Sequence, residues 1–264
     1  MATLGRVAKR SEILRQHKVM YCEVYKAGST AWNSLMAHLY GKSKIIETKE
    51  FYRMQPLLKP SLQVFMKTLK DEHFVRLVVA REPLSRLLSA YRDRIEDTSH
   101  PSWQGSHYAP LILQYSRGKT FAKNEMYYAN KTIKIVPTFD EFIRYLVKTK
   151  PATYDPHWMP ITLQCSVCNI NYTHIIHTET FIDDVRYILR ETGLNQKIDA
   201  SLLTLNAHKG KGNTGDLMMT YYSTVKPPSL QKIIDIYKDD FVYFDYNPIE
   251  VLKNIFPNET FKFS

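Results

Sequence analysis

The chain has 264 residues, of which 44% are hydrophobic and 23% charged, enough for one ordinary domain with a buried core. This composition excludes a wholly disordered, collagen-like or low-complexity protein. Lysine and arginine number 36 against 26 aspartate and glutamate residues, so the formal net charge is +10. Such a surplus predicts attraction to polyanions (nucleic acid, acidic membranes, nucleotide phosphates or acidic polysaccharides) without choosing among them.

The sequence contains no stretch of about 20 apolar residues of the kind that crosses a membrane. Its N-terminus is basic and lacks the apolar region of a secretory signal. Three N-x-[ST] sequons, at Asn130, Asn171 and Asn258, nevertheless suit passage through a secretory compartment.

The first expected unit is a buried strand over 18–25 followed by a helix over 31–40. Between them lies the turn Lys26-Ala27-Gly28-Ser29-Thr30, in which Ser29 or Thr30 is the expected helix cap. A glycine-containing turn that opens a helix presents backbone N–H groups to an anion, and the lysine adds a positive charge. The turn therefore indicates either a phosphate site or a simple capped turn with a solvated lysine; the spacing of a P-loop NTPase is absent.

A second unit of the same form has a strand over 74–80 and a helix over 83–95, with proline in its first turn. A third has a strand over 172–177 and a helix near 180–191. This alternation predicts a parallel α/β sheet whose ligand crevice lies at the carboxyl ends of the strands. Arg81 directly follows the second strand, so it should lie in this crevice, where its guanidinium suits phosphate recognition.

The rest of the chain is less regular. Helices are expected over 121–129, 139–147 and 229–237, whereas the polar and aromatic segment 99–115 is interpreted as a long functional loop. Arg86, Arg92 and Arg94 are interpreted as a solvated helix face that pairs with nearby acidic residues. The expected domain covers 18–250, preceded by a basic segment over 1–17, the remnant of a stem, and followed by a tail over 251–264.

Taken together, the Lys26 turn and the segment that begins at Arg81 resemble the co-substrate signatures of Golgi carbohydrate sulfotransferases of the chondroitin 4-O- and HNK-1 type. In that family, P-K-V-G-C-T-N-W after a strand holds the 5′-phosphosulfate of 3′-phosphoadenosine-5′-phosphosulfate (PAPS), and R-x-P-x-x-R-L-x-S-A-Y-R holds its 3′-phosphate. The resemblance covers about residues 18–246, including the segments 155–160 and 221–241. The co-substrate residues it implies are Tyr25, Lys26, Ala27, Gly28, Ser29, Thr30, Ala31, Arg81, Glu82, Pro83, Leu84, Ser85, Arg86, Leu87, Leu88 and Ser89.

The first signature departs from the family at three positions, where Tyr25 replaces proline, Ser29 replaces cysteine and Ala31 replaces asparagine. The resemblance implies a P-loop-like sulfotransferase fold, PAPS as co-substrate without a metal, and an anionic or amino-sugar glycan as acceptor rather than nucleic acid. It also implies a Golgi type II membrane protein, whose anchor is absent from this sequence. Lys26 would contact the sulfate and the bridging oxygen of the leaving group. Arg81 and Ser89 would hold the 3′-phosphate.

Sulfuryl transfer to a sugar hydroxyl benefits from a general base that titrates near neutral pH, and an imidazole fits this task. By resemblance the segment Asp155–Pro160 lies on the acceptor side, so His157 is the candidate base. The alternative is a packed structural histidine beside Trp158. Glu23 and His107 are the other candidates for the base.

Two further motifs have competing interpretations. Cys165-x-x-Cys168 followed by His174 and His177 could hold zinc, but the spacer is short and the two histidines would point to opposite faces of a strand. A disulfide or a reduced pair within this motif is expected instead. The G-x-G-x-x-G match over 210–215 does not open a βαβ unit and is interpreted as a mobile loop placed to close over the co-substrate.

The function predicted from the sequence is thus sulfuryl transfer from PAPS to a carbohydrate hydroxyl. Two alternatives stay open at this point: a kinase-like phosphoryl transferase that uses the same crevice, and a non-catalytic basic module that binds glycans.

Overall fold

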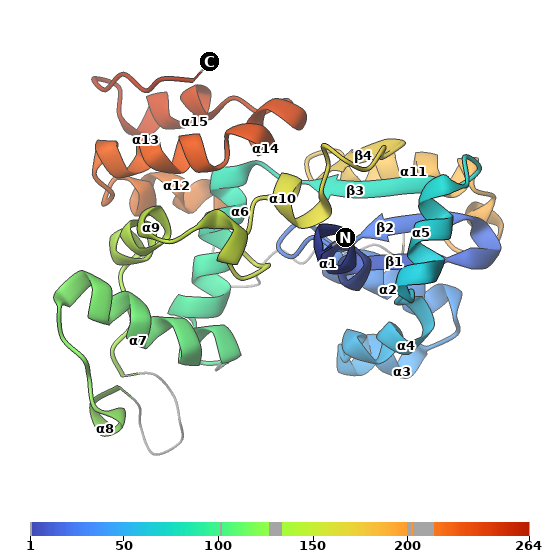
Figure 1. The fold of residues 1–264 in the computed structure, drawn as a ribbon, viewed down its shortest axis with the longest axis horizontal. Helices are drawn as coiled ribbons and strands as arrows, with labels where there is room; N and C mark the ends of the chain where they lie inside the picture. Colours follow the sequence, from blue (N-terminus) through green and yellow to red (C-terminus); the bar gives the residue numbers. More distant parts are fainter. Residues whose placement is uncertain (1, 101, 127–133, 200–201, 203–213, 264) are drawn as a thin grey trace. The chain divides into compact units, whose positions relative to one another are not determined.

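The computed structural model describes residues 2–100, 102–126, 134–199, 202 and 214–263 (Figure 1). The chain divides into two compact units, each built from two separate stretches of sequence. The first unit combines Met1–Arg81 with Ile161–Gly210, and the second combines Glu82–Pro160 with Lys211–Ser264.

The first unit contains a four-stranded sheet in the order β1-β2-β3-β4. Its strands are β1 Ser11–Leu14, β2 Val19–Cys22, β3 Val75–Ala80 and β4 His174–His177. Strand β3 runs parallel to both of its neighbours, β2 and β4, while β1 pairs with β2 in the antiparallel direction. The expected central parallel sheet with flanking helices is therefore confirmed, with one antiparallel strand added at its edge.

The helices of this unit surround the sheet. They are α1 Ala2–Arg10, α2 Ser29–Leu39, α3 Ser43–Thr48, α4 Gln55–Leu58, α5 Leu62–Lys70, α10 Ile161–Cys165 and α11 Phe181–Glu191, with short 3-10 turns at Arg15–His17, Phe51–Met54 and Leu194–Gln196. Helix α1 buries Val7 and Ala8 in the same apolar cluster as Met20 of β2 and Phe65 of α5. Residues 2–14 are therefore folded into this unit.

The second unit consists of helices in its described part. They are α6 Pro83–Tyr91, a π-helical turn Arg92–Glu96, α7 Trp103–Arg117, α8 Lys123–Met126, α9 Phe139–Lys148, a 3-10 turn Pro151–Thr153, α12 Thr214–Tyr222, α13 Pro227–Ile236, α14 Lys238–Tyr243 and α15 Pro248–Ile255. Its core is aromatic, as in the packing of Tyr91 against Phe139 and Phe142, with ring centroids 5.1 and 5.5 Å away. Of the expected helix over 121–129, the part after residue 126 lies outside the described residues, as does the loop predicted from position 210 up to residue 213.

The prediction of a long loop over 99–115 is wrong, because helix α7 occupies most of this segment. The Ser102 hydroxyl caps it by accepting a hydrogen bond from the Gly105 N–H at 2.9 Å, and Gly118 ends it in the left-handed conformation. Its buried side includes Gly105 and Ala109, which are too small to form a clear apolar stripe, and Pro110 lies in its interior. These small residues and the internal proline hid the helical period.

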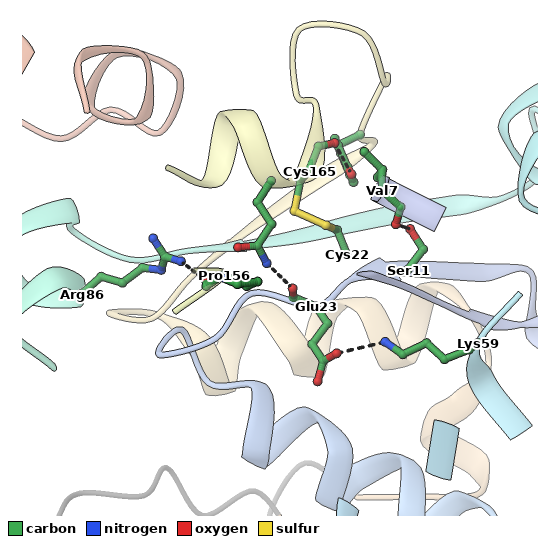
Figure 2. Close-up of a disulfide and its surroundings, with 10 residues drawn as sticks. Val7, Ser11, Cys22, Glu23, Lys59, Arg86, Pro156 and Cys165 are labelled. Atoms are coloured by element: carbon green, nitrogen blue, oxygen red, sulfur yellow. Dashed lines mark hydrogen bonds and ion pairs between the residues drawn. A yellow bond between two sulfur atoms is a disulfide. The ribbon is translucent and has the colours of Figure 1, made fainter. Parts of the chain in front are cut away.

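A disulfide joins Cys22 at the end of β2 to Cys165 at the end of α10, across 143 residues of sequence (Figure 2). The expected pair within the C-x-x-C motif is therefore wrong, and Cys168 is an exposed free thiol. A cross-link over so long a loop restricts the unfolded chain, an effect commonly worth about 2–5 kcal/mol. The bond fixes Ile161–Cys165 to the sheet within the first unit.

Candidate functional site

Two turns meet at the carboxyl edge of the sheet in the first unit. The chain leaves β2 after Cys22 and reaches the Lys26 turn, and it leaves β3 after Ala80 and continues with Arg81. Because β2 and β3 are parallel neighbours, both exits lie at the same edge. Nη1 of Arg81 donates a hydrogen bond of 2.9 Å to the Lys26 carbonyl, across 55 residues of sequence. The structure thus brings these two predicted site residues into direct contact.

The Lys26 turn has an unusual backbone. Lys26 and Gly28 both adopt the left-handed conformation, with φ of 66° and 79°. Helix α2 begins at Ser29 with Gly28 as its cap, so the expected cap at Ser29 or Thr30 is wrong. A Cβ added to Gly28 would lie 3.0 Å from the Phe181 ring, and any side chain would also strain the turn. A glycine turn that opens a helix in this way offers N–H groups to an anion.

The other residues of the first signature divide by burial. Ala27 and Ala31 are buried in the core, while Ser29 is half-buried and Thr30 exposed at the start of α2. The Tyr25 hydroxyl, at the position where the resembled family has proline, accepts a hydrogen bond of 3.0 Å from Arg10. Besides Tyr25, the polar side chains of this signature that keep some solvent exposure are therefore those of Lys26, Ser29 and Thr30.

From Glu82 onward the second signature lies in the second unit, where most of its side chains are buried or cap helix α6. The Glu82 carboxylate accepts hydrogen bonds from the N–H groups of Leu84 and Ser85, at 3.0 and 2.6 Å, and so caps helix α6. Pro83, Leu84, Leu87 and Leu88 are buried. Ser89 is also buried, in the second turn of the helix. Its assignment to the 3′-phosphate rests on the signature alone.

Arg86 is buried, so its interpretation as part of a solvated face is wrong. Its guanidinium donates to the backbone carbonyls of Met159 at 2.8 Å and Pro156 at 3.1 Å. These acceptors satisfy a charge that would otherwise be costly to bury. Arg92, which was expected on the same solvated face, is buried too. Arg94 is about a third exposed, and its Nε lies 2.9 Å from Oδ2 of Asp93. Arg86 therefore fixes the segment that carries His157.

His157 forms a buried pair with Asp155 in the second unit. Its Nδ1 lies 2.6 Å from Oδ1 of Asp155, which also accepts the backbone N–H of His157 at 2.9 Å. Burial acts to raise the pKa of Asp155, but hydrogen bonds from the side chain and backbone of His157 prevail and lower this pKa below its usual value. An ionised carboxylate can only accept hydrogen bonds, so it favours a proton on Nδ1 of His157.

The two other candidate bases lie in different settings. His107 is exposed on helix α7 and stacks on Trp103. Glu23 is buried in the first unit, where one of its oxygens lies 2.9 Å from the ammonium of Lys59 (Figure 2). Because this ion pair already engages the carboxylate, Glu23 is poorly placed to accept a substrate proton. Of the three candidates, His157 is the one whose imidazole is held by a neighbouring carboxylate.

Lys59 is the partner of Glu23, and no pattern in the sequence pointed to this ion pair. Lys59 also lies 3.5 Å from Glu12 of β1, so two buried carboxyl groups share one ammonium. Burial raises the pKa of Glu12 to about 7; Lys59 opposes the shift and Glu23 adds to it. Polar residues in the short strand β1 obscured its burial in the sequence.

The raised pKa of Glu12 predicts a pH-dependent stability. The folded state binds this proton more tightly than the unfolded state, whose carboxyl has a pKa near 4.5, so the stabilisation is fully present below pH 4.5. It is lost as the pH rises to about 7, by an amount on the order of 3 kcal/mol. Chemical denaturation of the wild type and of Glu12→Gln at pH 4.5–8 tests this. Curves that stay parallel between pH 4.5 and 7 would contradict it.

The second unit has a shallow, open pocket of about 540 Å³ beside the π-helical turn. Arg92, Glu96, Thr98 and Tyr221 are among its lining residues, and the Tyr221 hydroxyl lies 2.8 and 2.9 Å from the two Glu96 oxygens. The sequence pattern indicated an unbroken helix over 83–95, so it gave no sign of the π turn that shapes this pocket. Among the described residues, no cluster of histidine, cysteine and acidic side chains suited to a metal ion occurs.

The sequence of this chain matches a known protein family and several of its members. The model of the sulfotransferase family matches residues 10–247. Carbohydrate sulfotransferase 14 of Danio rerio is 29% identical over 238 residues, covering 88% of this chain and 60% of the relative. Carbohydrate sulfotransferase 11 of Rattus norvegicus is 25% identical, with 90% and 67% covered.

A third relative, carbohydrate sulfotransferase 9 of Homo sapiens, is 27% identical over 88% of this chain and 52% of its own length. The chain thus spans about half to two thirds of the length of these relatives. No solved structure matches it.

Proposed function

Because the chain belongs to the sulfotransferase family, we propose that it is a carbohydrate sulfotransferase, which moves a sulfuryl group from PAPS to a hydroxyl group of a glycan. The match to the family model confirms the family resemblance expected from the two signatures. The observation that carries the proposed activity is the hydrogen bond between Arg81 and the Lys26 carbonyl at the edge of the sheet. It gathers a lysine, an arginine and the start of a helix, a donor set suited to a nucleotide with two phosphate groups.

In this proposal the Lys26 turn and Arg81 bind the co-substrate. The N–H groups of residues 28–30 hold the 5′-phosphate, and the Lys26 ammonium neutralises the negative charge that develops on the leaving oxygen. The Arg81 guanidinium, already oriented by its bond to the turn, contributes to the grip on the 3′-phosphate. PAPS itself supplies the sulfuryl group, and the bisphosphate departs with the electron pair of the broken S–O bond.

His157 is the candidate base in the same proposal. Nε2 of His157 takes the proton of the acceptor hydroxyl as its oxygen attacks sulfur in line, and Asp155 stabilises the imidazolium that forms. The basic composition, with a net charge of +10, supports an anionic glycan as acceptor.

We place the protein in the Golgi lumen as part of this proposal. The disulfide between Cys22 and Cys165 supports an oxidising compartment. The sequon residues Asn171 and Asn258 are exposed, whereas Asn130 lies outside the described residues. None of the helices in the described ranges has both the length and the apolar character needed to cross a bilayer.

The function is tested by isothermal titration with adenosine 3′,5′-bisphosphate and with ATP, followed by transfer of radiolabelled sulfate from PAPS to desulfated glycosaminoglycans. We expect the bisphosphate to bind in preference to ATP, and Arg81→Ala to weaken its binding about tenfold to a hundredfold, the range for a lost charged hydrogen bond. Arg53→Ala, an exposed arginine of the same unit, is the control. A preference for ATP would favour a kinase, and binding of neither nucleotide would favour a non-catalytic glycan-binding module.

A further inference from the structure

Helix α7 carries a row of exposed apolar and aromatic residues along one side. Trp103, His107, Leu111 and Tyr115 recur every four residues, a spacing that places them on the same helix face. Trp103 is 63% exposed, the largest value among the bulky apolar side chains in the described part of the chain. The other two tryptophans, Trp32 and Trp158, are fully buried. Tryptophan is usually well buried, so a tryptophan with this exposure is unusual beside two that are fully buried.

The rings of Trp103 and His107 are stacked. Their centroids lie 4.7 Å apart and their planes differ by only 9°. The ring of Tyr108 meets both at nearly a right angle and packs in turn against Trp158, with centroids 4.9 Å apart. The stacked pair therefore contacts the ring of Tyr108, which itself packs against the core of the second unit. The pair forms a flat surface of defined orientation at the start of α7.

The same turn of α7 contacts the Asp155–His157 pair. Nε2 of Gln104, the residue after Trp103, lies 3.3 Å from Oδ2 of Asp155 and 3.4 Å from Nδ1 of His157. Tyr108 provides a second link, since it packs on the residue that follows His157. All of these residues belong to the second unit. Two independent contacts thus tie the stacked rings to the proposed base.

We propose that the free face of Trp103, backed by the stacked imidazole of His107, is a platform on which a sugar ring of the acceptor glycan stacks. This inference rests on the proposed function, since it concerns how the acceptor is held for the same reaction. A pyranose ring has an apolar face of C–H groups and a rim of hydroxyl groups. The free face of the Trp103 indole matches the apolar face of the sugar, while His107 covers the opposite face of the indole and fixes its orientation. Because Gln104, next to Trp103, contacts the Asp155–His157 pair, a sugar stacked here lies on the same side of the second unit's α7 as the proposed base.

The position of the platform favours a glycan over a protein partner. The platform offers one flat indole face, and the neighbouring residue Gln104 contacts the polar Asp155–His157 pair. A sugar can use an apolar and a polar surface at once. A protein interface would need a much larger covered area, about 800 Å² on each partner. A sugar requires only the area of a ring or two.

Because Trp32 and Trp158 are buried, a quencher in solution reaches mainly Trp103, so fluorescence quenching tests binding at the platform directly. Acrylamide should quench mainly the fluorescence of Trp103, and saturating desulfated chondroitin should protect it from quenching. In kinetic measurements, Trp103→Ala should raise KM for this acceptor about threefold to tenfold, the range expected for the loss of an aromatic contact. KM for PAPS should stay unchanged, and Trp103→Phe should retain part of the affinity. Tyr52→Ala, which removes a side chain of 61% exposure from the first unit, is the matched control.

The outcomes separate the platform from the function on which it rests. Protection of Trp103 by the glycan without sulfate transfer would sustain the platform and refute the enzyme. Sulfate transfer with an unchanged acceptor KM in Trp103→Ala, and no protection from quenching, would overturn the platform and leave the enzyme intact. A Trp103→Ala variant that changes only the sedimentation of the protein, with both glycan readouts unaffected, would also overturn it and indicate a protein interface instead.

Discussion

Replacing Lys26 with alanine is expected to abolish sulfate transfer, with a loss in kcat on the order of 10²–10³ or more. In the proposed reaction, the Lys26 ammonium lies at the leaving oxygen. Negative charge develops on this oxygen only as the S–O bond breaks. The loss of one such electrostatic contact typically costs this much. Transfer of radiolabelled sulfate from PAPS measures the effect, and titration with adenosine 3′,5′-bisphosphate shows how much nucleotide binding remains.

Lys18, a second lysine with a left-handed backbone, provides a matched control for this experiment. Lys18 and Lys26 lie on either side of β2, and both adopt positive φ, 50° and 66°. Changing either lysine to glycine removes a strained conformation, so each variant should keep the stability of the fold to within about 1 kcal/mol. Only Lys26→Gly should lose activity. Full turnover in Lys26→Gly, or an equal loss in Lys18→Gly, would remove Lys26 from the mechanism.

The parallel core of the first unit was predictable because its strands are short runs of apolar residues that the chain interrupts at turns. The segments 18–25, 74–80 and 172–177 contain β2, β3 and β4. Once these strands are placed in one parallel sheet, the residues that follow them must emerge at the same edge. The meeting of Lys26 with Arg81 follows from that rule, although no local pattern encodes their hydrogen bond.

The features that the sequence did not reveal depend on contacts between distant residues. The pairing of Cys22 with Cys165 is one case, because spacing alone cannot choose among partners 143 residues apart. The burial of Arg86 is another, since two carbonyl groups some 70 residues further along the chain make it tolerable. Strand β1 was missed for a related reason. Its Ser11 and Glu12 are polar but buried, so the strand lacks an apolar signature.

The Asp155–His157 pair carries the second large prediction. His157→Ala is expected to lower kcat by about 10²–10⁴, the range for removal of a general base, while the affinity for adenosine 3′,5′-bisphosphate stays unchanged. His157→Gln keeps a polar side chain in the buried position without a basic nitrogen and should show the same loss. His73→Ala, at an exposed histidine of the first unit, should retain full turnover.

Asp155→Asn distinguishes a base from a packed histidine. The ionised carboxylate now fixes the proton on Nδ1 through a contact of 2.6 Å, which leaves the lone pair on Nε2. An amide can present its N–H to the same nitrogen and so favour the opposite tautomer, in which Nε2 no longer accepts a proton. If His157 is the base, Asp155→Asn should lower kcat although the histidine is still present. If the pair is only structural, both Asp155→Asn and His157→Gln should lower the melting temperature and leave the kcat of the folded fraction unchanged, and the base would have to be sought elsewhere.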